Sequence, residues 1–306
     1  MELVSAIITT HGRLELLKKA INSVLNQTYS NIELIVIDDC STDGTKEWAE
    51  NELPNRANYI YIKKEDSKGG NHARNIGISL SKGKYIAFLD DDDVWYPTKI
   101  EKQVKLMQTN PQMVMSYCGH RKVYDNGSPA TVIPSNTFTG DLHQKVHTMV
   151  FCTTSMIMIQ KSILSKSGIF DENLRFWQEY DLIIRLCQYG QVGCVPEVLV
   201  DILHSTSDAS RLSIKIDGWL EAVDYVTQKY LQSIDSLSKE EKKKRQLMIY
   251  NDAANRCYAA DDMKQHQEFL KKAWQVDYSL KHWVKYKLNL SNRSIESWKK
   301  KIKKSS

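Results

Sequence analysis

The sequence feature that most limits the fold is an alternation of apolar runs and helical patterns, in which two runs lead directly into aspartates. The apolar runs are residues 3–9, 32–37, 58–62 and 84–89, and the helical patterns between them are residues 13–26, 46–51 and 71–81. This alternation predicts a mostly parallel sheet with helices on its faces. The second run ends in Asp38-Asp39 and the fourth in Asp90–Asp93. Because ligands bind beyond the carboxyl ends of parallel strands, we expect both acidic groups at one rim.

The pattern changes near residue 210. The expected strands before that point are residues 113–118, 131–133, 154–159 and 192–203, with a helix at 179–189. Beyond residue 213 the apolar spacing is helical only, and Ser238 with Glu241 forms a capping-box pattern. We therefore expect an α/β domain over residues 1–210 and a helical region over residues 211–306. A chain of 306 residues is long enough for both.

Composition places the chain among ordinary globular proteins, with 42% hydrophobic and 26% charged residues. The first residues do not form a basic segment followed by an apolar run, and no stretch approaches ~18 apolar residues. These features predict a cytoplasmic protein without a membrane-spanning helix. The six cysteines form no CxxC pair, so we expect buried, reduced thiols rather than disulfides or a zinc site.

Four consecutive aspartates at the end of an apolar strand repel one another unless a cation neutralises them. Carboxylate oxygens suit Mn²⁺ or Mg²⁺, and both ions also accept phosphate oxygens. In a strand or tight turn, Asp90 and Asp92 point to one side and Asp91 and Asp93 to the other. One pair could then bind sugar hydroxyls while a single carboxylate holds the metal. The alternative is a solvated acidic turn.

Two neighbouring segments carry polar groups that suit a nucleotide. A carboxylate of Asp38 or Asp39 could accept a hydrogen bond from a base N–H, whereas the alternative is that Asp39 or Asp43 caps the following helix. Arg74 lies at a helix start after two glycines, an arrangement that favours a diphosphate. Those glycines do not form a GxGxxG motif after a strand, so a dinucleotide-binding fold is not indicated.

Taken in order, these segments resemble the motifs of the family 2 glycosyltransferases. The matching segments, which span residues 3–205, are Val4–Arg13, Ser23–Tyr29, Asp38–Thr45, Ala73–Gly77, the DXD-type segment Gly83–Asp93, Gly168–Glu172 and Glu179–Leu182. The resemblance implies the GT-A fold, which is a Rossmann-like, mostly parallel sheet flanked by helices. It also implies an inverting hexosyltransferase of bacterial surface polysaccharide assembly.

The resemblance also implies the substrates and the donor-binding residues. The expected donor is a nucleotide-sugar, with UDP as the nucleotide and dTDP or GDP as alternatives, and the acceptor is a glycan or lipid-linked glycan. The donor-side residues carried over to this chain are Thr9, His11 and Asp39 at the nucleobase, Arg13 and Arg74 near the donor pocket, Asp90 and Asp91 at ribose or sugar hydroxyls, and Asp92 at the metal. His11 replaces the usual tyrosine and Gly12 the usual asparagine, so stacking on the base is weaker or comes from elsewhere.

In the family, a carboxylate of the later acidic motif deprotonates the acceptor hydroxyl, and the metal neutralises the leaving diphosphate. That motif usually reads Glu-Asp or Gln-Asp, whereas this chain has Gln178-Glu179. Glu179 is therefore the predicted base, and Asp181 is the alternative unless it serves as a helix N-terminal acid. By the same resemblance His204, after the last core strand, is a further candidate ligand of metal or diphosphate, with a structural role as the alternative.

Positive charge is concentrated at the C-terminus. Residues 281–306 hold nine Lys and Arg against one acid, a net +8, so residues 1–280 carry −3 of the total +5. Tryptophans and tyrosines between the lysines predict a segment that lies on an anionic membrane surface, at the inner face of the cell membrane. The alternative is a solvated helix end packed by its tryptophans. Because no nucleic-acid-reading module accompanies this tail, we expect no nucleic-acid partner.

Two other functions are compatible with an α/β fold that carries acidic residues at its strand ends. A nucleotidyltransferase or sugar-nucleotide pyrophosphorylase would need a Gly-rich nucleotide loop with a Lys/Arg signature near the start, which Ile8–Arg13 lacks. A non-catalytic sugar-nucleotide-binding module would not need the intact acids at Asp90–Asp93 and Glu179. Both alternatives are therefore less favoured by the sequence.

Overall fold

The structure is a computed structural model that describes residues 1–53, 57–124, 130–132, 138–204 and 216–288. The chain divides into two compact units. Unit 1 comprises residues 1–143, 150–174 and 178–207, and unit 2 comprises residues 144–149, 175–177 and 208–306. Two short segments from within the first 210 residues thus belong to the second unit.

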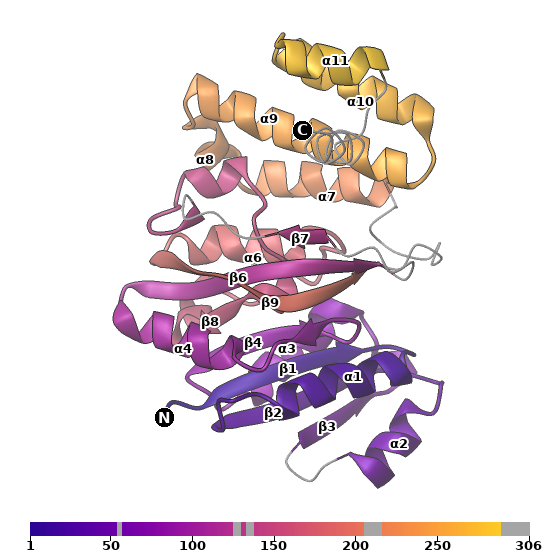
Figure 1. Cartoon of the computed structure of the whole chain (residues 1–306), viewed down its shortest axis with the longest axis vertical. Helices are drawn as coiled ribbons and strands as arrows, with labels where there is room; N and C mark the ends of the chain where they lie inside the picture. Colours follow the sequence, from indigo (N-terminus) through magenta and orange to yellow (C-terminus); the bar gives the residue numbers. More distant parts are fainter. Residues whose placement is uncertain (54–56, 125–129, 133–137, 205–215, 289–306) are drawn as a thin grey trace, which may run out of the picture. The chain divides into compact units, whose positions relative to one another are not determined.

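Unit 1 is built on a nine-stranded sheet with the order β3-β2-β1-β4-β8-β6-β9-β5, and β7 pairs with β6 (Figure 1). The strands are β1 (Val4–Thr10), β2 (Ile32–Asp39), β3 (Ala57–Ile62), β4 (Tyr85–Asp90), β5 (Val94–Trp95), β6 (Met113–Tyr124), β7 (Ala130–Val132), β8 (Met158–Gln160) and β9 (Gln191–His204).

All the longer strands of the sheet run in the same direction. The pairs β1–β2, β2–β3, β1–β4 and β6–β9 are parallel. Strand β8 runs antiparallel to both β4 and β6, so β6 and β9 point the same way as β1 to β4. The expected mostly parallel sheet is confirmed, and β8 is the inverted strand that joins its two parallel groups.

Helices flank this sheet, as the sequence predicts. They are α1 (Leu14–Leu25), α2 (Thr45–Glu52), α3 (Gly70–Leu80), α4 (Lys99–Thr109), α5 (Leu164–Ser167) and α6 (Gln178–Leu186). Strands β1, β2 and β4 lie at the centre and are buried along most of their length, which requires cover on both faces. The helix α4 is absent from the sequence prediction, although its buried residues Ile100, Val104 and Met107 follow helical spacing.

Unit 2 is helical in its described part, which confirms the expected C-terminal helical region. Its helices are α7 (Ile216–Lys229), α8 (Leu231–Asp235), α9 (Lys239–Ala259), α10 (Met263–Val276) and α11 (Leu280–Leu288). The predicted capping box is present at the start of α9, where the Glu241 N–H donates to Ser238 Oγ and the Ser238 N–H donates to Glu241 Oε2. Among the described helices, none combines the length and apolar character needed to cross a bilayer.

Candidate active site

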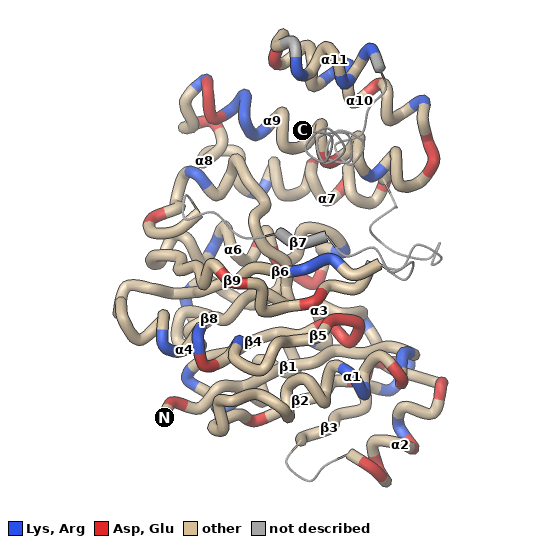
Figure 2. The backbone as a smooth tube through the Cα atoms, in the orientation of Figure 1, with Lys and Arg blue, Asp and Glu red and all other residues tan. Residues whose placement is uncertain are grey.

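The carboxyl ends of β1, β2 and β4 meet at one rim of the sheet, as expected from the sequence. The register pairs Thr10 with Asp38, and Thr9 with Asp90. The acidic turn Asp90–Asp93 follows β4 at this rim and lies just before β5, where it is coloured red in Figure 2. Strand pairing therefore brings together two acidic groups that lie about fifty residues apart in the sequence.

The four carboxylates of the acidic turn alternate between the interior and the solvent. Asp91 and Asp93 are both 4% exposed, whereas Asp90 and Asp92 are partly exposed. The Asp93 N–H donates to the Asp90 carbonyl, which closes the turn. Asp93 Oδ1 accepts from the Leu203 N–H of β9 at 3.1 Å. Asp93 therefore anchors the turn, while Asp90 and Asp92 are presented at the rim.

Two arginines neutralise this cluster. Arg13 Nη1 lies 3.1 Å from Asp91 Oδ1 and 3.0 Å from Asp92 Oδ2. Arg74 Nη2 lies 2.7 Å from Asp90 Oδ1. Burial raises the pKa of Asp91 to about 6, and Arg13 opposes this shift. Arg13 is 46% exposed in its side chain, so it is the cation within reach of solvent and of a ligand.

Asp38 and Asp39, at the end of β2, have different environments. Asp38 accepts hydrogen bonds from the Ser41 N–H and the Tyr59 hydroxyl, so both its oxygens hold the local structure. Asp39 Oδ1 is buried and has no hydrogen-bond partner among the described residues. The capping role expected as an alternative belongs to Asp43, which accepts from the N–H of Thr45 at the start of α2 at 3.3 Å and also from the N–H of Leu14 at the start of α1. Asp39 thus keeps an acceptor oxygen for a ligand.

His11 lies beside this acceptor. Its Nδ1 is 2.5 Å from the carbonyl oxygen of Asp39, and since a carbonyl only accepts, Nδ1 carries the hydrogen. The imidazole is exposed at the rim, as is the adjacent Gly12 at φ +64°. The Gly12 N–H donates to Ser41 Oγ at 2.7 Å, which fixes the turn after β1 against the turn after β2.

Two asparagines at the start of α3 hold the loop that leads towards α6. Asn71 Nδ2 donates to the Leu174 carbonyl at 2.5 Å and to the Asp171 carbonyl at 2.9 Å. Asn75 exchanges two hydrogen bonds with the backbone of Phe170. The family-like segments around residues 73–77 and 168–172 are therefore one structural clamp, and the clamp lies beside Arg74 and its partner acid.

The two candidate bases of α6 differ in their surroundings. Asp181 is fully buried, and its Oδ2 accepts from Arg185 Nε and Nη2 at 3.1 and 2.7 Å. Arg185 also donates to the Ser167 carbonyl, so Asp181 belongs to a structural network. Glu179 lies in the first turn of the same helix and is partly exposed. Glu179 is therefore the more accessible of the two candidate bases.

A short segment links Glu179 to the acidic turn. Ser155 Oγ accepts from the Asp90 N–H at 3.0 Å. Burial raises the pKa of Cys152, and the nearby Glu179 carboxylate raises it further. The segment from Cys152 to Ser155 therefore has Glu179 near one end and is bonded to the acidic turn at the other. Ser155 was not singled out in the sequence, and no local signal there marks it.

A metal ion bound at this rim would need some of its ligand atoms from a bound substrate. Among the described residues, no group of three His, Cys, Asp or Glu side chains is arranged to hold a metal ion. The backbone of His204 ends β9 opposite Tyr124, and its side chain lies outside the described part of the chain. The partly exposed Asp92 carboxylate, paired here with the Arg13 cation, offers one hard oxygen ligand. That donor set fits an ion whose other ligands are phosphate oxygens.

A family model described as Glycosyl transferase family 2 matches residues 5–168. The uncharacterized glycosyltransferase RC0461 of Rickettsia conorii is 34% identical over 73% of this chain and 37% of its own length. The E. coli UDP-Glc:alpha-D-GlcNAc-diphosphoundecaprenol beta-1,3-glucosyltransferase WfaP is 42% identical over 39% of this chain and 47% of its own length. The putative teichuronic acid biosynthesis glycosyltransferase TuaG of Bacillus subtilis is 32% identical over 51% of this chain and 62% of its own length. The chain thus spans less than two thirds of each of these relatives.

Solved structures share the fold at low sequence identity. The S. aureus TarS 1–349 structure in complex with UDP-GlcNAc superposes with a TM-score of 0.59 at 17% identity, covering 90% of this chain and 83% of that one. Mannosyltransferase PcManGT from Pyrobaculum calidifontis, in complex with GDP-Man and Mn²⁺, gives a TM-score of 0.53 at 14% identity, with 93% and 87% covered. The expected GT-A architecture is confirmed.

Proposed function

Because this chain belongs to glycosyl transferase family 2, we propose that it is an inverting transferase that moves a hexose or N-acetylhexosamine from a UDP-sugar. The acceptor is a glycan or a lipid-linked glycan of surface polysaccharide synthesis, the kind of substrate that the name of WfaP states. The observation that carries the proposal is the rim itself. It combines an unpartnered buried oxygen of Asp39, partly exposed Asp90 and Asp92, and Glu179.

The nucleotide end of the donor lies across the ends of β1 and β2. Asp39 Oδ1 accepts an N–H of the base, which would remove an unsatisfied buried acceptor. Thr9 and the exposed imidazole of His11 border the same position. A donor base without an N–H for Asp39 would leave that oxygen unpaired, so this contact also contributes to base selection.

The sugar and diphosphate lie over the acidic turn. Asp90 and Asp91 accept from ribose or sugar hydroxyls, and Asp92 is the protein ligand of Mn²⁺ or Mg²⁺. A bound divalent ion would neutralise charge on the departing diphosphate. Arg13 occupies that charge position in this structure, and its half-exposed guanidinium is a second group that could pair with a phosphate. Arg74 is 8% exposed, and its ion pair with Asp90 fixes the position of that carboxylate.

In the transfer step, Glu179 is the general base. Its carboxylate takes the proton from the acceptor hydroxyl as that oxygen attacks the anomeric carbon. The bond from the anomeric carbon to the phosphate oxygen breaks on the opposite face, and UDP leaves with the bonding electron pair. The product has the inverted configuration. Asp181 is not suited to this role because Arg185 holds its carboxylate inside the protein.

The proposed lipid-linked acceptor also indicates where in the cell the enzyme acts. A lipid-linked glycan lies at the inner face of the cell membrane, and the basic C-terminal tail would hold the enzyme there as a peripheral protein. Residues 289–306 of that tail lie outside the described part of the chain. The charge of the tail, read from the sequence, is what supports this part of the proposal.

Calorimetric titration of UDP-glucose and UDP-N-acetylglucosamine, with and without Mn²⁺, tests the donor site. We expect binding of at least one donor that strengthens with Mn²⁺ and weakens ~10-fold or more in Asp92→Asn, because that variant removes a charged metal ligand. Asp224→Asn is the matched control, since Asp224 is an exposed acid on α7 of unit 2. Metal-assisted donor binding that survives in Asp92→Asn would overturn the assignment.

A further inference from the structure

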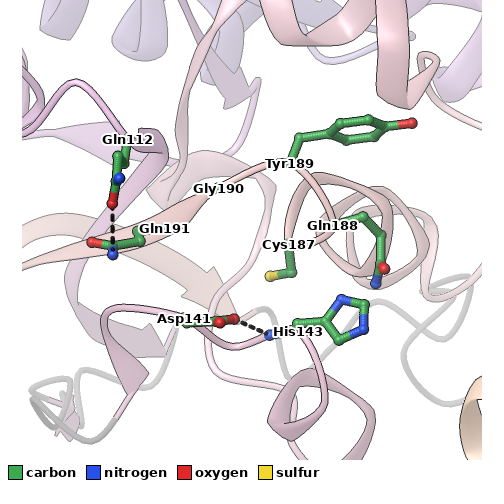
Figure 3. A pocket seen from close by; sticks show the side chains of 8 residues that line it. All are labelled: Gln112, Asp141, His143, Cys187, Gln188, Tyr189, Gly190 and Gln191. Carbon is green, nitrogen blue, oxygen red and sulfur yellow. Dashed lines mark hydrogen bonds between the residues drawn. The ribbon is translucent and has the colours of Figure 1, made fainter.

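A cleft lies in unit 1, at the edge of the sheet opposite the acidic turn. Strands β6 and β9 begin here and α6 ends here, whereas the acidic turn follows the carboxyl end of β4. The volume of the cleft is about 420 Å³, within the ~300–1,000 Å³ range of small-molecule sites. Its lining residues, which Figure 3 shows, are Gln112, Asp141, His143, Cys187, Gln188, Tyr189, Gly190 and Gln191.

One wall of the cleft is a chain of side-chain amides. Asn110 Nδ2 donates to Gln191 Oε1 at 2.8 Å, and Gln191 Nε2 donates to Gln112 Oε1 at 3.1 Å. The Gln191 N–H also donates to the Gln112 carbonyl at 2.8 Å, so both side chains project from a paired backbone. The Gln112 amide nitrogen ends this relay and makes no hydrogen bond within the described residues. It is a positioned donor.

The facing wall is the segment that carries Asp141 and His143. Gly140 and Val192 exchange both backbone hydrogen bonds, at 2.8 and 2.9 Å, which fastens this segment to β9. The His143 N–H donates to Asp141 Oδ1 at 3.0 Å, which orients the carboxylate. Both side chains are exposed, and Figure 3 shows Asp141 between Gln191 and the imidazole. This wall offers one carboxylate and one imidazole.

The end of α6 supplies the third side. Tyr189 is 47% exposed, and its hydroxyl donates to the Lys166 carbonyl at 3.1 Å, which holds the phenol ring in a fixed position. Gln188 is exposed next to it, with Nε2 3.3 Å from the Ile184 carbonyl, and its Oε1 accepts no hydrogen bond from the described residues. Cys187 is 3% exposed, and burial raises the pKa of its thiol to about 12, so it is not a nucleophile.

The chemistry of this lining excludes several ligand classes. No lysine or arginine occurs among the described residues that line the cleft, so it does not suit a phosphate or nucleotide. Aliphatic side chains are also missing from that set, so a lipid or apolar peptide would gain little there. What remains are amides, a carboxylate, an imidazole and an aromatic ring. These groups match the hydroxyls and the C–H face of a neutral sugar.

We propose that this cleft is a binding site for a neutral saccharide, separate from the donor and acceptor positions at the acidic rim. The cleft and Glu179 lie at opposite ends of α6, ~12 Å apart along the helix axis. A glycan held in the cleft would stay close to the enzyme between transfers, which raises its effective concentration at the catalytic rim. The saccharide site itself does not depend on the proposed chemistry, because it rests on the lining alone.

Saturation-transfer NMR on the full chain tests the site with four disaccharides: maltose, cellobiose, lactose and N,N′-diacetylchitobiose. We expect saturable binding of at least one, weakened ~10-fold by Tyr189→Ala and by Gln188→Ala, because each removes a contact with the sugar. The matched controls are Tyr225→Ala, at a tyrosine that is 42% exposed on α7, and Gln232→Ala on α8. Both controls should bind like the wild type, and circular dichroism and thermal melting establish that each variant is folded.

Three outcomes would overturn the proposal: no disaccharide binds the wild-type chain, binding persists unchanged in both cleft variants, or excess UDP with Mn²⁺ displaces the sugar. The last outcome would place the sugar in the donor site instead. Donor titrations on the same samples keep this result apart from the proposed function. Tyr189→Ala should leave the affinity for UDP-sugars unchanged. A wild-type chain that binds no UDP-sugar would contradict only the transferase proposal.

Discussion

At the residue scale, the acidic turn after β4 shows how four identical side chains take different roles. Asp93 is buried and bonded to the backbone of β9, and Asp91 is buried against Thr10 and Arg13. Asp90 and Asp92 remain partly exposed. The division follows from the contacts of the turn, because Thr10 and Arg13 hold the Asp91 carboxylate and the Leu203 N–H holds that of Asp93. Asp90 and Asp92 are the two acids of this turn whose side chains are within reach of solvent, each beside an arginine.

Replacement of Glu179 by Gln tests its assignment as the base. The amide keeps the shape of the side chain but cannot take a proton, so we expect the transfer rate to fall ~10²–10⁴-fold. Donor affinity, measured by calorimetry, should not change, since Glu179 acts on the acceptor. Glu221→Gln, at an exposed acid on α7, is the matched control. A Glu179→Gln enzyme with wild-type turnover would point to another base.

Asp181→Asn separates a catalytic from a structural role for the second acid. Asp181 is fully buried and paired with Arg185 at 2.7 Å. Loss of one partner of a buried pair leaves an uncompensated charge, so we expect the free energy of unfolding to fall by about 3 kcal/mol. Denaturant unfolding measures that loss. A stable but inactive Asp181→Asn would instead assign the chemistry to Asp181.

Lys99 is a buried cation without a hydrogen-bond partner among the described residues. Its Nζ lies 3.9 Å from the centroid of the Trp95 ring, which attracts a cation by ~2 kcal/mol. Desolvation of a fully buried ammonium costs several kcal/mol and exceeds this attraction. Burial therefore lowers the pKa of Lys99 to about 7. At neutral pH, part of the Lys99 population is therefore uncharged in the folded protein. The charged form is the one that opposes folding.

Lys99→Met should stabilise the protein in a pH-dependent way. Between about pH 7 and the ordinary lysine pKa of ~10.4, the unfolded wild type binds more protons than the folded one, so its stability rises with pH. The variant lacks this dependence. We expect its advantage to be greatest at or below pH 7 and to shrink by ~2 kcal/mol between pH 7 and pH 9. Urea unfolding at both pH values measures it, and an equal gain at both would contradict a depressed pKa.

At the element scale, α3 carries contacts on two of its faces. Asn71 and Asn75, one turn apart, hold the loop before α6, and Arg74 between them holds Asp90. On the face towards the sheet, Gly77 lies directly against Ile7 of β1. A Cβ at residue 77 would come within 2.5 Å of Ile7 Cγ2. The close approach of helix and strand therefore depends on a residue without a side chain.

Gly77→Ala should destabilise the protein although alanine is the better helix former. The gain in helix propensity is ~1 kcal/mol, whereas overpacking against a buried isoleucine costs ~1–3 kcal/mol and shifts the helix. We expect a lower melting temperature and weaker donor binding, because α3 positions Arg74 and Asp90. Ser79→Ala, at an exposed position of the same helix, should leave both unchanged. A Gly77→Ala protein as stable as the wild type would contradict the close contact.

At the scale of the whole molecule, the C-terminal charge belongs partly to a packed helix. In unit 2, Lys285 of α11 is 4% exposed, and its Nζ lies 3.3 Å from Asn251 Oδ1 of α9. Trp274 of α10 and Tyr286 of α11 stack with ring centroids 5.8 Å apart. The part of the basic segment up to residue 288 therefore supports the fold of unit 2. Residues 289–306 carry the remaining tail charge.

Deletion of residues 289–306 tests the membrane role without loss of α11. The deletion removes Arg293 and five lysines, each worth ~1 kcal/mol near an anionic surface. We expect co-sedimentation with phosphatidylglycerol vesicles to fall at least tenfold, while donor hydrolysis changes less than twofold. Replacement of those six basic residues by Gln in the full chain is the second variant. Equal pelleting of all three proteins would refute the membrane role.

Local sequence patterns predict individual strands, whereas the way the strands pair depends on distant residues. Strand bounds near residues 4–10, 32–39 and 85–90 were predicted because apolar runs bounded by turn residues are local patterns. A strand was expected at residues 154–159, but the structure has β8 at Met158–Gln160, and its inverted direction was not predicted because pairing direction depends on residues distant in the sequence. The Asn71 and Asn75 clamp could have been suspected from two amides spaced one helical turn apart, but its partners could not.

Taken alone, the sequence determined the alternation of strands and helices, the acidic ends of β2 and β4, and the family. Those features follow from periodicity and from motif order, which are properties of neighbouring residues. Only the tertiary structure decided that Asp38 and Asp181 are bonded within the protein, while Oδ1 of Asp39 has no hydrogen-bond partner in the part of the chain that the structure describes. Burial and hydrogen bonding are set by partners tens of residues away in the chain, and these are what separate a structural carboxylate from one available to a ligand.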